Sequence, residues 1–284
     1  MQLMCSKQEF RSRDMEIIYK ELGEGDVTSL TPFHAYSMNG AARRKDLVYA
    51  NFGREKDFQK LISLGINVTD RIVLTKYGMG GRAGKVLMAE RYGAAGILIY
   101  GDPKQYAPVL SEKFPHGRWL SDDGVQRGSI MSRVNGVPEG DPMTGGYPAK
   151  DWAYRPHDVS EVKGISKIPS QPIAASDAEI LLSYLGGDEV LDDNDGWKGT
   201  LNVTYRYGPL NNTAFKVDLV VNNENKITGI RNVCGFMKGE VEPDRYVMLG
   251  NHIDSWVNGA VDATSGTTVM MEIARVLGVK HKTG

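Results

Sequence analysis

Short apolar runs alternate with helical patterns in the first half of the chain, and this alternation limits what the chain can fold into. Three runs are rich in β-branched and aromatic residues: 46–52 (DLVYANF), 71–77 (RIVLTKY) and 96–100 (GILIY). A helical pattern at 55–64 lies between the first two runs, and another at 84–92 lies between the last two. A strand–helix–strand order requires crossover connections, which join parallel strands. The sequence therefore predicts an α/β fold with a partly parallel sheet covered by helices.

The remaining chain predicts longer loops and fewer elements. Residues 101–172 are rich in Gly, Pro, Asp and Trp, and loops of this length usually serve a function or an interface. A helix is expected over Ser176–Leu185, opened by a capping box of Ser176 and Glu179. Further apolar runs predict four strands and a helix, the helix last: 201–207, 215–222, 227–237, 245–249 and 267–277.

The balance of charge argues against one class of partner. Lys and Arg (34) nearly equal Asp and Glu (35), so the formal net charge is −1. Without a basic stripe or an Arg-rich run, nucleic acid is not expected as the main partner. The two cysteines form no disulfide framework, and Cys234, inside an apolar run, is expected to be a buried thiol.

Three N-x-[ST] triplets begin at Asn67, Asn202 and Asn211, and such triplets accept sugars in secreted proteins. No apolar stretch approaches the ~20 residues that span a bilayer. The first residues also lack the apolar stretch of a signal peptide. The sugar acceptors and the missing signal disagree, and one resolution is that the chain is part of a longer secretory protein.

The strongest chemical signal follows the apolar run at 245–249. His252 and Asp254 come just after it, and Asp262 lies in a glycine-rich loop before a helical pattern. A histidine past the end of a strand is well placed to bind zinc in the crevice there. Asp254 could then fix the tautomer of that ring, and Asp262 could bridge two ions. The alternative is a surface histidine beside an N-capping aspartate.

These motifs resemble one known family. The sequences RNV (231–233), G-x-x-x-G (235–239), VEPDRYVMLGNHIDSW (241–256) and the glycine loop around Asp262 look like the start of the catalytic domain of the glutamate carboxypeptidase II family of di-zinc peptidases. Upstream, the chain resembles that family's protease-associated, or apical, domain in six segments: DLVYANFG, RIVLTKYG, AERYGAAGILIYGDP, GVQRG, GDPMTGGYPAKDWAYR and IPSQPI. The resemblance runs from about residue 27 to residue 278.

The resemblance implies roles for the residues that match. His252 would bind one of two zinc ions, Asp262 would bridge both, and Asp254 would stand behind the histidine. Arg82 would bind a substrate carboxylate from the apical domain, because a guanidinium fork suits a carboxylate. Ser129 would line the substrate site where the glutamate-selective member has asparagine, and this shorter side chain argues against a strict preference for glutamate.

The resemblance also implies a structural calcium ion, held in part by Thr144 and Tyr147, and a division of the chain. Residues 27–45 and 227–284 would belong to the zinc peptidase domain, 46–226 would form the apical domain, and 1–26 have no assigned role. The family acts as a homodimer on the cell surface, tethered by an N-terminal anchor that this chain lacks. The residues that build most of its dimer interface would lie outside this chain.

The expected function is that of a zinc carboxypeptidase that removes C-terminal, often acidic, residues from peptides. Each zinc ion needs about three protein ligands, and the family's other ligands and general base would lie beyond Gly284. This chain alone is therefore expected to be inactive, with apolar surface left exposed by a partial domain.

One alternative is a non-catalytic binding module, either a short isoform or a relative similar to the transferrin receptor ectodomain. In such receptors the zinc ligands are lost, whereas this chain keeps His252 and Asp262. Another alternative is a cytosolic aminopeptidase of the same clan, against which the sugar acceptors and Arg82 count.

Overall fold

The computed structural model describes residues 8–9, 12–13, 31–132, 140–191 and 194–283. The chain forms two compact units, residues 1–225 and 226–284, and each is described by itself. Within residues 1–26 the described part is a short antiparallel pair, β1 (Gln8–Glu9) and β2 (Ser12–Arg13). The role of the first 26 residues otherwise lies outside the described residues.

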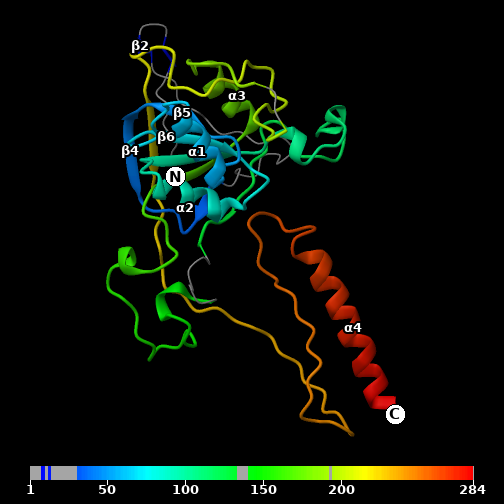
Figure 1. Cartoon of the computed structure of the whole chain (residues 1–284). Coiled ribbons are helices and arrows are strands. Elements are labelled where there is room, and N and C mark those ends of the chain that lie inside the picture. The colour runs from blue at the N-terminus through cyan, green and yellow to red at the C-terminus, as the bar shows by residue number, and fades with distance from the viewer. Residues whose placement is uncertain (1–7, 10–11, 14–30, 133–139, 192–193, 284) are drawn as a thin grey trace. The chain divides into compact units, whose positions relative to one another are not determined.

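A four-stranded parallel sheet is the framework of the first unit (Figure 1). Its strands, in spatial order, are β5 (Leu47–Tyr49), β6 (Ile72–Lys76), β7 (Gly96–Tyr100) and β9 (Ser170–Ile173). Helices α1 (Glu55–Ser63) and α2 (Arg82–Arg91) are the crossovers that join the first three strands. Every residue of the four strands is buried, as in parallel sheets generally. The predicted α/β fold is confirmed.

Two smaller sheets complete this unit. Strand β4 (Gly40–Lys45) pairs with β10 (Val217–Val221) in antiparallel fashion, and β3 (His34–Ala35) pairs in parallel with β8 (Gly128–Ser129). The strand expected at 215–222 is thus present. Residues 31–45 pair here within the first unit, and their assignment to a peptidase domain stays a prediction.

Aromatic packing, rather than a strand, holds the segment around residues 186–210. Trp197 is fully buried, and its carbonyl oxygen accepts a hydrogen bond of 2.8 Å from the Tyr49 hydroxyl. The rings of Trp197 and Tyr205 lie 5.8 and 5.7 Å from the Tyr49 ring. The expected strand at 201–207 is wrong, because only the single bridge Glu189–Arg206 involves this run.

Helix α3 (Ala175–Ser183) begins one residue earlier than expected. The predicted capping box of Ser176 and Glu179 is wrong, because Ala174 is the N-cap and donates its N–H to the Asp177 carboxylate over 3.4 Å. In the long loop region the described residues carry β8, the start of β9 and four short 3₁₀ turns: Pro103–Gln105, Leu110–Glu112, Pro142–Thr144 and Val159–Glu161.

The second unit contains α4 (Thr264–Thr283), which starts three residues before the expected helix. The described residues 226–263 form neither of the strands expected at 227–237 and 245–249. A strand needs a partner to satisfy its backbone groups, and in this unit even Val247 is fully exposed. The prediction that Cys234 is buried is wrong, because the run around it forms no strand and its thiol is exposed. The expected exposed apolar surface is confirmed by Phe236 and Met248, each 90% exposed. Among the described helices, none is both long enough and apolar enough to cross a membrane.

Candidate functional site

A histidine between two carboxylates is the clearest chemical feature of the second unit. The Nδ1 atom of His252 lies 2.9 Å from Asp254 Oδ1 and 2.9 Å from the Asp254 carbonyl oxygen. Its Nε2 atom lies 2.9 Å from Asp262 Oδ1. The structure thus brings together the three residues that the sequence pattern singled out, with one carboxylate at each ring nitrogen.

The turn that carries His252 is tied to the start of α4 by two side chains. Asn251 donates through Nδ2 to the Ala263 carbonyl oxygen (3.1 Å) and to Thr267 Oγ1 (2.8 Å). The Thr267 hydroxyl in turn donates to the His252 carbonyl oxygen over 2.8 Å. Sequence reasoning missed both of these supporting residues, because nothing in the local pattern shows that a loop asparagine meets a helix sixteen positions later.

The charges around His252 favour a cation at its ring. The pKa of His252 is raised, first because Asp254 accepts a hydrogen bond from the ring, with Asp262 acting in the same direction. An imidazole nitrogen and a carboxylate are both zinc ligands. Neighbouring ligands of a tetrahedral zinc ion with bonds of about 2.0 Å stand about 3.3 Å apart. The 2.9 Å between Nε2 and Asp262 Oδ1 needs only a small adjustment to admit an ion.

The donor set in the described residues is nevertheless partial. No group of three or more His, Cys, Asp or Glu side chains that could hold a metal ion occurs among them. A zinc ion takes about three protein ligands and a water at a catalytic site. Residues His252 and Asp262 fit zinc by type and spacing, but they provide two of these ligands.

A second candidate site lies in the first unit, where Arg82 meets the end of β8. Arg82 opens α2, and its Nε donates to the Ser129 carbonyl oxygen over 3.0 Å. The guanidinium lies against Gly128, since a Cβ built there would fall 2.2 Å from Arg82 Cζ. The Ser129 hydroxyl accepts instead from the Met131 N–H (3.2 Å). The two predicted substrate residues are therefore neighbours, linked through the backbone of Ser129.

A buried polar cluster supports the strand that carries Ser129. The ring nitrogens Nδ1 and Nε2 of His34 lie 2.8 Å from Ser170 Oγ and 2.8 Å from the Tyr77 hydroxyl. That hydroxyl donates its single hydrogen to the Gln126 carbonyl oxygen (2.7 Å). His34 Nε2 must therefore donate to Tyr77, and Nδ1 must accept from Ser170. Sequence reasoning missed this cluster, whose members come from four distant segments.

His34 is neutral in this setting. Its side chain is fully buried, and burial lowers its pKa to about 3, with the positive charge of Arg82 adding to the shift. Because β3 pairs with β8, His34 stands opposite Gly128 in the register. A neutral histidine thus supports the backbone against which the Arg82 guanidinium lies.

The predicted calcium ligands lie around a 3₁₀ turn. Thr144 is buried, and its Oγ1 lies 3.2 Å from the Asp141 carbonyl oxygen and 3.0 Å from that of Tyr147. The Tyr147 side chain is exposed. Backbone carbonyl oxygens of this kind are calcium ligands, but here the threonine hydroxyl already lies at hydrogen-bond distance from both of them. The calcium site stays a prediction.

The three predicted sugar acceptors, Asn67, Asn202 and Asn211, are all exposed and lie outside helices and strands. In the first of them, Asn67 Oδ1 accepts from the Thr69 N–H over 2.9 Å. Their threonines are exposed as well. The geometry leaves all three accessible, and their modification stays a prediction.

Comparison with known proteins places both units. Residues 36–131 match the PA domain, and residues 232–283 match Peptidase family M28. The chain is 42% identical over 272 residues to "Aminopeptidase NAALADL1" of Rattus norvegicus, which covers 92% of this chain and 35% of that protein. It is 36% identical over 283 residues to "Glutamate carboxypeptidase 2 homolog" of Caenorhabditis briggsae, which covers 98% of this chain and 36% of that protein.

The chain thus spans about a third of the length of these relatives. A solved structure, "Aminopeptidase from Aneurinibacillus sp. strain AM-1", matches 51% of this chain and 22% of its own at 18% identity, with a TM-score of 0.28. That score is too low to establish a common fold. By its sequence, the chain thus joins a segment that matches the PA domain to one that matches Peptidase family M28, and over most of its length it is similar to a glutamate carboxypeptidase 2 homolog and to an NAALADL1 protein.

Proposed function

We propose that this chain supplies the apical domain and part of the metal centre of a zinc-dependent carboxypeptidase that acts on peptides. The observation that carries the proposal is the position of His252, with Nε2 facing Asp262 Oδ1 and Nδ1 facing Asp254 Oδ1, each at 2.9 Å. The match of this segment to Peptidase family M28 supports it.

Each of the three residues would have its own task at the metal. His252 and Asp262 would hold zinc, which when bound polarises a carbonyl group and lowers the pKa of a water molecule. Asp254 keeps the ring of His252 in one orientation by accepting a hydrogen bond from Nδ1. With two ligands in its described residues, the chain by itself is expected to bind zinc weakly and to hydrolyse no peptide.

Arg82 would recognise the substrate's C-terminal carboxylate. Its Nε is committed to the Ser129 carbonyl oxygen, so its terminal N–H groups are the donors for the substrate. Two parallel hydrogen bonds from a guanidinium hold a carboxylate in a defined orientation. Because the Ser129 hydroxyl is shorter than an asparagine side chain, we expect acidic side chains to be accepted without strict selection.

The proposed location is the cell exterior, on a surface-anchored homodimer. The exposed acceptors Asn67, Asn202 and Asn211 support exposure to the secretory pathway. Expression through the secretory pathway of animal cells should yield a protein whose mass falls after treatment with an N-glycosidase. The triple variant Asn67→Gln, Asn202→Gln, Asn211→Gln should show no such change. An unmodified wild-type protein would contradict this location.

The proposed calcium at Thr144 and Tyr147 should add thermal stability that chelation removes.

An aminopeptidase is the second candidate, because the rat relative at 42% identity carries that name. The two activities differ in the end of the peptide that they read. A carboxypeptidase cleaves an N-acetylated dipeptide that ends in free glutamate, and an aminopeptidase cleaves a dipeptide amide with a free amino group.

The test offers both substrates to the longest natural product of the gene and to this chain. We expect glutamate release from the acetylated dipeptide by the longer product only, and its loss with a zinc chelator or with His252→Ala. The variant His281→Ala, which alters an exposed histidine of the same unit, is the control. Cleavage of the amide alone would favour the aminopeptidase. Cleavage of neither substrate by a zinc-loaded protein would favour a binding module.

A further inference from the structure

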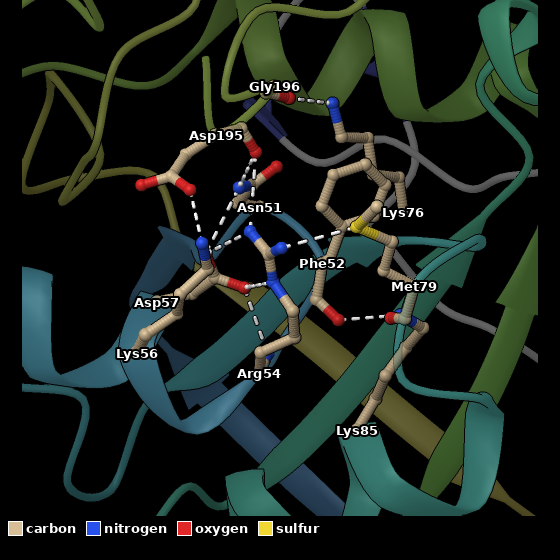
Figure 2. A network of polar contacts seen from close by, with 10 residues as sticks. All are labelled: Asn51, Phe52, Arg54, Lys56, Asp57, Lys76, Met79, Lys85, Asp195 and Gly196. Carbon is tan, nitrogen blue, oxygen red and sulfur yellow. Dashed lines mark hydrogen bonds and ion pairs between the residues drawn. The ribbon is translucent and has the colours of Figure 1, made fainter. Parts of the chain in front are cut away.

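Two buried lysines lie near the Phe52 ring in the first unit (Figure 2). The Nζ atoms of Lys76 and Lys85 stand 4.6 and 5.6 Å from the ring centroid. A buried ammonium group is costly unless it is hydrogen-bonded. Lys76 donates to the Gly196 carbonyl oxygen, and Lys85 donates to those of Phe52 (2.6 Å) and Met79 (2.7 Å). These two lysines therefore bind different loops.

Met79 belongs to the loop that joins β6 to α2. Gly78, Gly80 and Gly81 in this loop have φ angles of 104°, 94° and 61°, which residues with a side chain rarely adopt. Because glycines leave a loop many conformations, a single conformation has to be fixed by contacts. The Lys85 ammonium supplies one such contact, to Met79 O. A second, from the backbone N–H at position 85 to Gly81 O (3.3 Å), does not depend on the lysine side chain.

The loop that Lys85 holds leads directly into Arg82. Arg82 and Lys85 stand three positions apart on the first turn of α2, so they are neighbours on the helix. The lysine side chain binds the turn between β5 and α1 through Phe52 O, whereas the arginine side chain binds β8 through Ser129 O. The lysine side chain thus ties the first turn of α2 to two loops, and the serine carbonyl oxygen binds the guanidinium.

We propose that Lys85 is a positioning residue for Arg82, acting through the carbonyl oxygens of Phe52 and Met79. The proposal rests on the role proposed above for Arg82 in carboxylate recognition. The carboxylate of Asp57, which acts on Lys85 electrostatically, is occupied by Arg54, whose Nε and Nη2 lie 2.9 Å from its two oxygens. Backbone carbonyl groups are therefore the direct partners of the Lys85 ammonium.

The surroundings of Lys85 disfavour a positive charge on its side chain. Burial lowers the pKa of Lys85 to about 7, Asp57 opposes the shift, and Arg54 and Lys76 add to it. An aliphatic residue would fill the same space without that cost. The lysine amine, charged or neutral, keeps N–H donors for the two carbonyl groups that it joins.

Lys85→Met tests the proposal in the 284-residue chain, with Lys76→Met as a matched control. Both lysines are 1% exposed and both donate to carbonyl groups, but Lys76 binds the loop at Gly196 instead. The readout is hydrogen exchange at the Arg82 Nε–H, which donates to Ser129 O, measured by NMR. We expect Lys85→Met to speed this exchange about tenfold or more and Lys76→Met to leave it near the wild-type rate.

Equal effects of the two variants would overturn the proposal, since loss of general stability would then explain both. An unchanged rate in Lys85→Met would overturn it as well. Should Lys85→Met not fold, Lys85→Arg keeps a cationic donor, and an Arg82 Nε–H rate near that of wild type is then required. No substrate enters this measurement, so a failure of the proposed function would show separately, as an absence of carboxylate binding in a protein whose Arg82 is well ordered.

Discussion

Arg82 and Ser129, 47 positions apart in the sequence, are joined by a 3.0 Å hydrogen bond from the arginine Nε to the serine carbonyl oxygen. The contact uses the backbone of Ser129, so the side chain at this position can vary without loss of the bond. It orients the guanidinium while leaving the terminal nitrogens for a ligand. The same contact explains why the glycine before Ser129 matters.

Replacing Arg82 with lysine should weaken binding of N-acetylglutamate about tenfold to hundredfold. Lysine lacks the planar fork and loses the anchor to Ser129 O, and a hydrogen bond to a charged group contributes about 1.5–3 kcal/mol. Calorimetric titration measures the affinity. Arg118→Lys, at an exposed arginine of the same unit, should bind as wild type does. Equal affinities for Arg82→Lys and Arg118→Lys would remove Arg82 from the ligand site.

Gly128→Ala should displace the guanidinium of Arg82. A Cβ at this position would lie 2.2 Å from Arg82 Cζ, and the end of a long side chain yields more readily than backbone. The φ of 156° at Gly128 adds backbone strain, so the variant should be less stable than wild type. Its folded form should bind N-acetylglutamate as weakly as an Arg82→Ala variant. The control is Gly84→Ala in α2, where a Cβ meets no atom within 4 Å and alanine should stabilise the helix by up to about 1 kcal/mol. Full binding by Gly128→Ala would contradict the packing described here.

The buried His34 should make the fold less stable as the pH falls. Its folded pKa of about 3 lies below the unfolded value of 6.5, so between these values the unfolded chain binds more protons. Stability is thus fully present above pH 6.5 and falls towards pH 3, by at most about 1.4 kcal/mol per pH unit from this group. Urea unfolding at pH 7, 5 and 4 should show the slope, and His34→Gln should reduce it.

Asp177 acts in the opposite direction over part of the same range. Burial raises its pKa to about 6 from 3.8, so this group favours the folded state more as the pH falls from 6 to 3.8. Asp177→Asn should therefore steepen the loss of stability on acidification, whereas His34→Gln flattens it. Slopes that move in the same direction in both variants would be inconsistent with this assignment.

Asp254→Asn should lower the zinc affinity of the chain about 10- to 100-fold. The carboxylate binds the Nδ1 side of His252 at 2.9 Å, and partners of this kind orient a ligand and raise its basicity. Competition with a chromogenic chelator measures the affinity. Asp244→Asn, at an exposed aspartate of the same unit, should leave it unchanged. If Asp254→Asn also binds zinc like wild type, then Asp254 does not support the metal ligand.

The sequence by itself determined the parallel sheet β5–β6–β7 and its crossover helices. Their apolar periodicity is a property of neighbouring residues, and a buried strand such as Gly96–Tyr100 can be recognised without knowing its partners. The candidate residues His252, Asp254 and Asp262 were found for the same reason, since they lie within a stretch of eleven residues.

Only the tertiary structure decided which distant residues meet. It brings together Arg82 with Ser129, His34 with Tyr77, and Lys85 with Phe52 O, and each pair comes from segments that are far apart in the sequence. The strands expected at 227–237 and 245–249 failed for a related reason. An apolar run becomes a strand only when a partner satisfies its backbone groups, and the sequence of the run itself does not say whether that partner is present.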